Sequence, residues 1–200
     1  MKYNLKNQKL LIASNNQGKV REIQSLLSLF DFEVISASNF DIPEPEETGL
    51  TFAENSRLKA KYYGSLTNLP ALADDSGFCV EELDGFPGLY SARVAGEDKN
   101  YYKVFSQIED SLKQRNLKTS KAHFICSLAI WYPDGSLYDF EGRVDGMLSF
   151  PSKGENGFGY DPIFIPNGYN KTFAQMNKVE KDQISHRFIA FKKLVEKLLV

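Results

Sequence analysis

The chain has 200 residues, of which 42% are hydrophobic and 25% are charged, and its formal net charge is −2. This length supports one sizeable core, and we treat residues 1–200 as a single domain that has room for two lobes. A charge balance this close to neutral argues against general nucleic-acid binding, which requires a broad basic surface. The sequence has no apolar run as long as a membrane span, and its first residues lack the hydrophobic core of a signal peptide. We therefore expect a cytoplasmic protein with no membrane and no nucleic-acid partner.

The first predicted elements are a strand, a polar turn and a helix. Residues 10–13 form a short apolar strand, a helical pattern of apolar residues begins at Val20, and a second strand is predicted at 33–36. The turn places backbone N–H groups and the positive end of the helix dipole where an anion can bind. A capped surface helix without a ligand has the same pattern. The candidate phosphate-binding residues of this turn are Ser14, Asn15, Asn16, Gln17, Gly18 and Lys19.

An acidic loop at 43–49 leads into a predicted helix. Thr51 and Glu54 have the spacing of a capping box, so the helix is expected to begin there. Glu47, just ahead of the helix, is a candidate metal ligand, and Lys59 on the helix is a candidate phosphate contact. A solvated acidic loop and a surface lysine are the alternative. The apolar line of this helix is Leu58, Tyr62 and Leu66, spaced at i, i+4 and i+8.

Asp74 and Asp75 follow the apolar run 70–73, and Ser76 and Gly77 come next. We predict a strand that ends in a turn here and presents carboxylates to a hard cation such as Mg²⁺. Because successive strand side chains point to opposite faces, only one of the two carboxylates is expected to face a given pocket. A solvated turn is the alternative.

The two cysteines, Cys79 and Cys126, each lie inside an apolar run and are predicted to be small buried thiols. The two histidines, His123 and His186, are far apart in the sequence and follow no metal-ligand spacing. A structural zinc site is therefore not expected, and His123, inside a predicted strand, is interpreted as structural.

The second half of the chain contains a helix predicted from Asn100, a hairpin with strands at 122–132 and 137–144, and a closing amphipathic helix. Lys181, His186 and Arg187 lie near the start of that last helix. Cations there oppose the helix dipole, which favours a role in which they face a ligand.

A Gly-rich segment at 154–164 is a second candidate site. Phe158 and Tyr160 offer flat faces on which a nucleobase can stack, and the glycines allow close backbone approach. Asp161, before a proline, offers a carboxylate as hydrogen-bond acceptor or metal ligand. A structural turn of glycines and aromatic residues is the alternative.

The polar residues singled out form two opposed sets. Carboxylates together with a divalent cation and several basic groups are what a polyphosphate requires, since bare carboxylates would repel it. The residues therefore indicate a metal-dependent enzyme that acts on a nucleoside polyphosphate. The carboxylates are Glu47, Asp74, Asp75 and Asp161, and the cations are Lys19, Lys59, Lys181 and Arg187.

Six blocks of the chain resemble, in order and spacing, the motifs of the inosine triphosphate pyrophosphatase (Ham1-like) family: residues 14–22, 46–55, 73–77, 88–93, 157–162 and 185–187. The resemblance implies an α/β fold with two lobes, an elongated mixed β-sheet flanked by helices and a nucleotide cleft between the lobes, usually as a homodimer. It also implies Mg²⁺-dependent hydrolysis of ITP, dITP and XTP to the monophosphate and pyrophosphate.

Roles carried over from this resemblance are expectations for individual residues. Glu47 and Asp75 would bind Mg²⁺, Asp75 would also be the base that activates water, and Asp74 would support them. The triphosphate would be held by Ser14, Asn15, Asn16, Gln17, Gly18 and Lys19, with Lys59 beside it, and Ser76 would touch the substrate. The base pocket would be formed by Phe158, Gly159, Tyr160, Asp161, Lys181, His186 and Arg187, with Phe158 stacked on the purine.

Two departures from the family pattern and two alternatives accompany this hypothesis. Gln175 stands where the family commonly has Glu, and about eight N-terminal residues extend beyond the usual start. The alternatives are a Maf-like pyrophosphatase for pyrimidine or modified nucleotides, and a nucleotide-binding protein that has lost catalysis.

Overall fold

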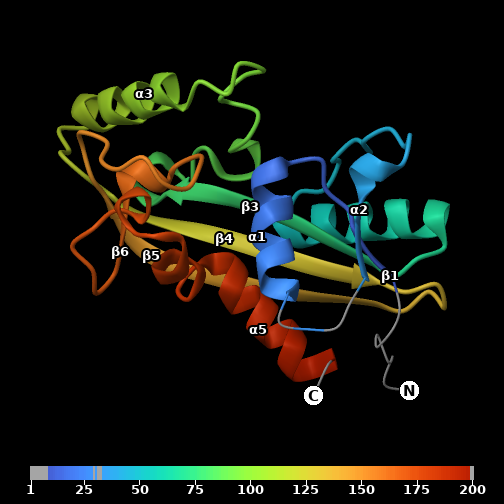
Figure 1. The fold of residues 1–200 in the computed structure, drawn as a ribbon. Coiled ribbons are helices and arrows are strands. Elements are labelled where there is room, and N and C mark those ends of the chain that lie inside the picture. The colour runs from blue at the N-terminus through green and yellow to red at the C-terminus, as the bar shows by residue number, and fades with distance from the viewer. Residues whose placement is uncertain (1–8, 29, 31–32, 199–200) are drawn as a thin grey trace. The chain divides into compact units, whose positions relative to one another are not determined.

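The computed structural model describes residues 9–28, 30 and 33–198 (Figure 1), so the expected N-terminal addition lies outside the described residues. The strands are β1 (Lys9–Ile12), β2 (Glu33–Ser36), β3 (Ala71–Val80), β4 (Lys121–Trp131), β5 (Leu137–Leu148) and β6 (Phe164–Pro166). The α-helices are α1 (Gln17–Leu27), α2 (Phe52–Thr67), α3 (Tyr101–Gln114), α4 (Lys178–Asp182) and α5 (His186–Leu198).

The described strands form one mixed sheet in the order β2-β1-β3-β4-β5-β6. β1 runs parallel to both β2 and β3, and β5 runs antiparallel to β6. The predicted strand at 33–36 and the predicted hairpin are confirmed, although β5 continues to Leu148, four residues beyond the expected Val144. A mixed sheet with helices packed on it confirms the α/β fold class.

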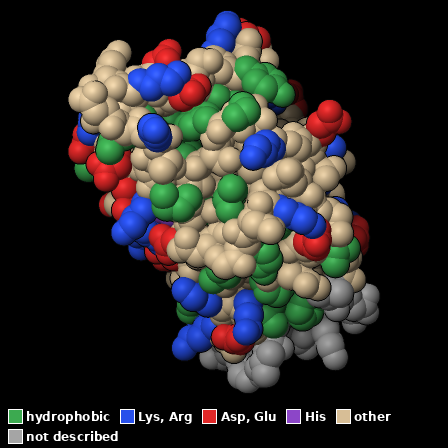
Figure 2. Space-filling view, turned by 90° about the vertical axis from the view of Figure 1, so that its left-hand side faces the viewer, with side chains coloured by type: hydrophobic (Ala, Val, Ile, Leu, Met, Phe, Trp, Pro, Cys, Tyr) green, Lys and Arg blue, Asp and Glu red, His purple; other side chains and the backbone are tan. Residues whose placement is uncertain are grey.

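The chain separates into two compact units. The first comprises residues up to Asp75, residues 126–142 and residues from Arg187 onward, and the second comprises residues 76–125 and 143–186. None of the helices in the described part of the chain combines the length and apolar composition needed to cross a bilayer. On the face shown in Figure 2, acidic and basic side chains are interspersed, with hydrophobic side chains scattered among them.

Alternation along the strands gives the first unit two apolar layers. Leu10 and Ile12 face one side, where they pack with α1 and α5 residues such as Ile23 and Phe191. Leu11, from the same strand, faces the opposite side, in the layer that contains α2 residues. Because successive strand side chains point to opposite faces, one short strand contributes to both layers.

The apolar line of α2 is not its most buried face, although Tyr62 packs against the core. Leu66 is 58% exposed, whereas small and polar residues of the helix are buried. Ser56 shares a hydrogen bond of 2.9 Å with Ser127 of β4, and a Cβ on Gly64 would lie 2.2 Å from the Trp131 ring. The helix therefore packs close to the sheet through its small side chains, which the apolar periodicity did not reveal. The start of α2 is as predicted, since Thr51 caps it through the Glu54 amide.

The second unit has one large core. Phe78 of β3 stacks on Tyr160 with ring centroids 4.9 Å apart, and the Tyr160 hydroxyl donates to the carbonyl of Ser91 at 2.8 Å. Phe105 and Ile108 of α3 pack into the same cluster. Tyr160, expected at a base pocket, is 3% exposed and therefore belongs to this core.

The predicted turn after Ala73 is wrong, because β3 continues without interruption from Ala71 to Val80. Asp74 and Asp75 both lie within the strand and are buried. Each carboxylate is paired with a basic side chain, and this pairing offsets the cost of taking a charge out of water. Solvent exposure is thus not required at this point, and the strand does not have to end.

Candidate functional site

The turn at the start of α1 is capped by its own side chains. Asn16 Oδ1 accepts hydrogen bonds from the amides of Gly18 (2.9 Å) and Lys19 (3.2 Å), and Ser14 Oγ accepts from the Asn16 amide at 3.2 Å. The strand, polar turn and helix start are therefore confirmed as structure. An anion that used the Gly18 and Lys19 amides would have to replace the Asn16 side chain there.

Asp74 is the centre of one buried ionic cluster. Its Oδ2 accepts from Arg187 Nε at 2.8 Å and from the Cys126 thiol at 3.0 Å, and its Oδ1 pairs with Lys19 Nζ at 2.9 Å. Burial alone would raise the pKa of Asp74, but the Arg187 and Lys19 charges outweigh it and hold that pKa well below the usual value. Arg187 also pairs with Glu22 of α1. Asp74 is consequently a permanent anion at neutral pH.

Asp75 belongs to a second cluster on the opposite face of β3. Lys59 Nζ from α2 lies 3.0 Å from Asp75 Oδ1 and 2.6 Å from Glu47 Oε1. Burial would lower the pKa of Lys59, but the charges of Asp75 and Glu47 raise it instead. Burial raises the pKa of Asp75, and Lys59 and Lys19 offset this only in part because Glu47 repels the same carboxylate. One ammonium thus serves two carboxylates, which leaves a net negative charge.

This second cluster fits a divalent cation. Asp75 Oδ2 is buried and has no hydrogen-bond partner among the described residues, so one carboxylate oxygen is available for a ligand. Mg²⁺ is usually held by one or two carboxylates together with water and substrate phosphates. Glu47 and Asp75 supply that number of carboxylates, and an added cation would neutralise the excess negative charge. These are the two residues that the sequence predicted as metal ligands.

The loop that carries Glu47 is fixed by the start of α2. The Gly49 amide donates to Asn55 Oδ1 at 2.8 Å. A Cβ on Gly49 would lie 2.5 Å from that oxygen, so the position requires glycine. The acidic loop is therefore tied to the helix that carries Lys59.

A third cluster, in the second unit, is built around Asp161. Asp161 Oδ2 accepts from Lys181 Nζ at 2.6 Å and from the Phe158 amide at 2.8 Å. The Lys181 ammonium lies 4.9 Å from the centroid of the Phe158 ring, and Phe158 as a residue is 37% exposed. Gly157 has a φ of +75°, and a Cβ there would lie 2.0 Å from Asp161 Oδ2. An exposed aromatic face beside a buried ion pair is an arrangement on which a flat polar ring can stack.

The structure places the predicted base-pocket residues in different surroundings. Phe158, Asp161 and Lys181 are together, as described above. The ring of His186 is buried and stacks on Phe124 with centroids 4.9 Å apart. Arg187 lies in the Asp74 cluster, where its guanidinium binds Asp74 and Glu22. The expected contact of Arg187 with the base stays a prediction.

Sequence reasoning gave no role to Glu22 or Cys126. Glu22 lies three residues after Lys19 on α1, and that spacing puts both side chains on one helix face. This spacing is the sequence pattern that indicates that Glu22 lies near Lys19. Cys126 lies in an apolar run, and nothing in that pattern distinguishes a thiol that donates to Asp74 from an ordinary core residue.

The fold and the paired clusters on β3 define an α/β protein with an ionic centre assembled from one strand, three helices and the loop that carries Glu47. The family model of the Ham1 family matches residues 10–197. The chain therefore belongs to the Ham1 family.

Relatives resemble this chain over nearly its whole length. The dITP/XTP pyrophosphatase of Zymomonas mobilis is 46% identical over 188 residues, which cover 94% of this chain and 90% of the relative. The dITP/XTP pyrophosphatase of Caulobacter vibrioides is 47% identical over 186 residues, which cover 93% of this chain and 95% of the relative. The solved structure of the Staphylococcus aureus Ham1 protein superposes with a TM-score of 0.84 at 40% identity, covering 96% of this chain and 98% of that one. The solved structure of a HAM1 protein from Coxiella burnetii superposes with a TM-score of 0.87 at 34% identity, covering 96% of this chain and 98% of that one.

Proposed function

We propose that this protein hydrolyses the non-standard purine nucleotides dITP, XTP and ITP to the nucleoside monophosphate and pyrophosphate. The observation that carries the proposal is the cluster in which the buried Lys59 and Asp75 meet the half-buried Glu47, with a net negative charge and an available oxygen on Asp75. Relatives at 46–47% identity are dITP/XTP pyrophosphatases, which supports the choice of substrate.

Asp75 is the group that takes the proton from the attacking water. Its pKa is raised because burial and Glu47 disfavour the carboxylate more than Lys59 favours it. Lys59 orients the Asp75 carboxylate through Oδ1 and keeps Glu47 beside it. A bound Mg²⁺ would supply charge neutralisation of the phosphates and a fixed orientation of the reacting phosphorus.

Lys19 and Lys59 provide the positive charge that a triphosphate needs in this unit. Lys19 is 2.9 Å from Asp74, whose lowered pKa keeps it ionised and thereby keeps the ammonium in place. The Ser14 to Lys19 turn then offers hydrogen-bonding side chains on the same segment. We assign the triphosphate to these residues.

Phe158, Asp161 and Lys181 are assigned to the base. Stacking on the exposed Phe158 face is worth about 1–3 kcal/mol and does not distinguish among bases. Discrimination requires donors that match a 6-oxo group, since a 6-amino group would leave them unpaired at a cost of up to about 10⁴–10⁵-fold in rate. Lys181 is a buried donor in this cluster, with 7% of its side chain exposed.

Product analysis tests the proposal. The protein is incubated with Mg²⁺ and, separately, with ITP, XTP, ATP, GTP and dTTP, and the products are separated by ion-exchange chromatography. We expect monophosphate and pyrophosphate from ITP and XTP only. Preferential cleavage of dTTP would favour the Maf-like alternative, and binding without cleavage would favour the nucleotide-binding alternative.

The role of Asp75 is tested by Asp75→Asn, which keeps the shape and removes the base. Turnover should be lost while nucleotide binding, measured by calorimetry, is retained. Asp139→Asn is the matched control, because Asp139 forms only a partly exposed pair with Arg57 at 3.5 Å. Normal turnover in Asp75→Asn would refute the role of Asp75 as the base that activates water.

A Mg²⁺ requirement, a homodimer and a cytoplasmic location complete the proposal. Turnover should disappear with EDTA and return on addition of Mg²⁺. Light scattering coupled to size-exclusion chromatography should give about twice the chain mass.

A further inference from the structure

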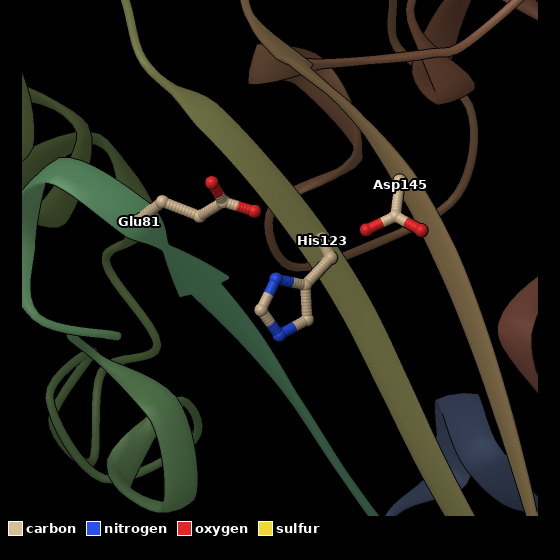
Figure 3. Close-up of side chains that lie close together, drawn as sticks. All are labelled: Glu81, His123 and Asp145. Carbon is tan, nitrogen blue, oxygen red and sulfur yellow. The ribbon is translucent and has the colours of Figure 1, made fainter.

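A second group of metal-ligating side chains lies in the second unit, on residues that the proposed function does not use. Glu81 follows the end of β3, His123 lies on β4 and Asp145 lies on β5. One ligand atom from each residue can be chosen so that all three lie within 4.8 Å of one another. Figure 3 shows the Glu81 and Asp145 side chains extending toward His123 from either side.

Strand alternation explains why these three residues meet. Val80, Ala122 and Phe124 belong to the apolar core of the second unit, and Val144 packs against it. Glu81, His123 and Asp145 are their immediate chain neighbours. Since β3, β4 and β5 are consecutive in the sheet, His123 and Asp145 project from the face opposite the core, and Glu81, the first residue after β3, lies beside them. The sequence spacing gave no sign of this grouping, because the ligands come from three separate segments.

Arg143 organises the two carboxylates without using all of their oxygens. Its Nε and Nη2 lie 2.8 and 2.6 Å from Asp145 Oδ1, and its Nη2 lies 3.6 Å from Glu81 Oε1. Each carboxylate retains a second oxygen. Metal-ligating carboxylates are themselves commonly hydrogen-bonded, which fixes their orientation, and Arg143 forms such a hydrogen bond with Asp145.

We propose that Glu81, His123 and Asp145 bind one divalent transition-metal ion of the Zn²⁺ or Co²⁺ type. An imidazole nitrogen with two carboxylate oxygens suits these ions, whereas Mg²⁺ prefers oxygen ligands alone. Bonds of about 2.0–2.2 Å to a central ion need ligand atoms separated by no more than about twice that length, and 4.8 Å is within a small side-chain adjustment of this limit. The exposed Glu81 and Asp145 leave the ion open to water on one side.

The consequence of the bound ion is a cross-link between three neighbouring strands. A ligand that binds the folded state alone stabilises it in proportion to the logarithm of its free concentration over its dissociation constant. The melting temperature should therefore rise with added Zn²⁺ and should return to its starting value with a chelator. This effect does not depend on nucleotide hydrolysis, so its test is independent of the test of the proposed function.

The test is a metal titration of the full chain after treatment with EDTA and desalting. Excess Mg²⁺ is present throughout, so that the oxygen-ligand cluster of Glu47 and Asp75 does not contribute. Zn²⁺ binding is measured by calorimetry and Co²⁺ binding by visible absorption. We expect one bound equivalent in the wild type, and a loss of at least about tenfold in affinity in His123→Gln, since even outer contacts of metal sites are worth 10–100-fold.

Two further variants complete the experiment. Glu81→Gln removes an exposed ligand with little risk to folding and should weaken binding in the same way. Glu141→Gln, which changes an exposed carboxylate on the same strand as Asp145, should bind as the wild type does. Equal Zn²⁺ affinity and stoichiometry in the wild type, His123→Gln and Glu81→Gln would overturn the proposal, as would a Co²⁺ spectrum that is unchanged by His123→Gln.

Discussion

Replacing Asp74 by Asn should destabilise the protein strongly, because this carboxylate compensates two cations. Arg187, whose side chain is 1% exposed, would lose its ion pair with Asp74 and keep the one with Glu22, and Lys19 would lose its ion pair with Asp74 at 2.9 Å. Breaking a buried ion pair on one side costs about 3–5 kcal/mol. For a chain of this size each kcal/mol lowers the melting temperature by about 2–4 °C, so we expect a fall of about 6–20 °C.

The assay is thermal unfolding followed by circular dichroism at neutral pH. The lowered pKa of Asp74 means that its stabilising contribution is fully present above the unfolded value of about 3.9 and is lost only as the pH falls through the folded-state pKa. Measurement at neutral pH therefore captures the whole effect.

Two comparisons make this prediction refutable. Asp139→Asn breaks a partly exposed pair with Arg57 and should cost at most about 1 kcal/mol. Adding Arg187→Met to Asp74→Asn should restore part of the melting temperature, because the uncompensated guanidinium is then gone. If Asp74→Asn melts no lower than Asp139→Asn, the account of a buried, charge-compensated centre is incorrect.

Two other predictions concern catalysis. Because Lys59 lowers the pKa of Asp75 and burial raises it, kcat/KM should fall as acid protonates Asp75, and Lys59→Gln should move this fall to higher pH. A pH–rate profile that shifts to lower pH would contradict this. Gly157→Ala should lower the melting temperature and raise KM, since its Cβ would lie 2.0 Å from Asp161 Oδ2. Gly168→Ala has a similar φ of +85° and open space, so it is the control, and equal effects in the two variants would show that only backbone strain matters.

Elements with strong periodicity or capping signals were predictable from the sequence. The start of α2 at Thr51 and the hairpin of β4 and β5 are where the patterns placed them. The prediction that Asp74 and Asp75 point to opposite faces is also confirmed, since one contacts Lys19 and the other Lys59. These features depend on the geometry of residues that are close together in the sequence, so a local sequence pattern is enough to predict them.

Features that depend on long-range pairing were not predictable. Two adjacent aspartates were expected to end a strand, because their partners on distant helices are invisible to a local pattern. The apolar periodicity of α2 does not indicate that Ser56 and Gly64 face the sheet, where their small size permits a closer approach. The ion pairs of Arg187 with Glu22 and Asp74 likewise join three segments that lie far apart in the sequence, and no local pattern predicts these pairs.

The alternation at Asp74 and Asp75 has a consequence for how this gene can change. Removing or inserting a single residue between Pro70 and Asp74 would turn both carboxylates to the opposite faces of β3. Asp74, which pairs with Arg187, would then face Lys59. Asp75, which pairs with Lys59, would face Arg187. Both ion pairs would be lost although every side chain would still be present. We expect this short segment to accept many apolar replacements in a mutational library and no change in its length.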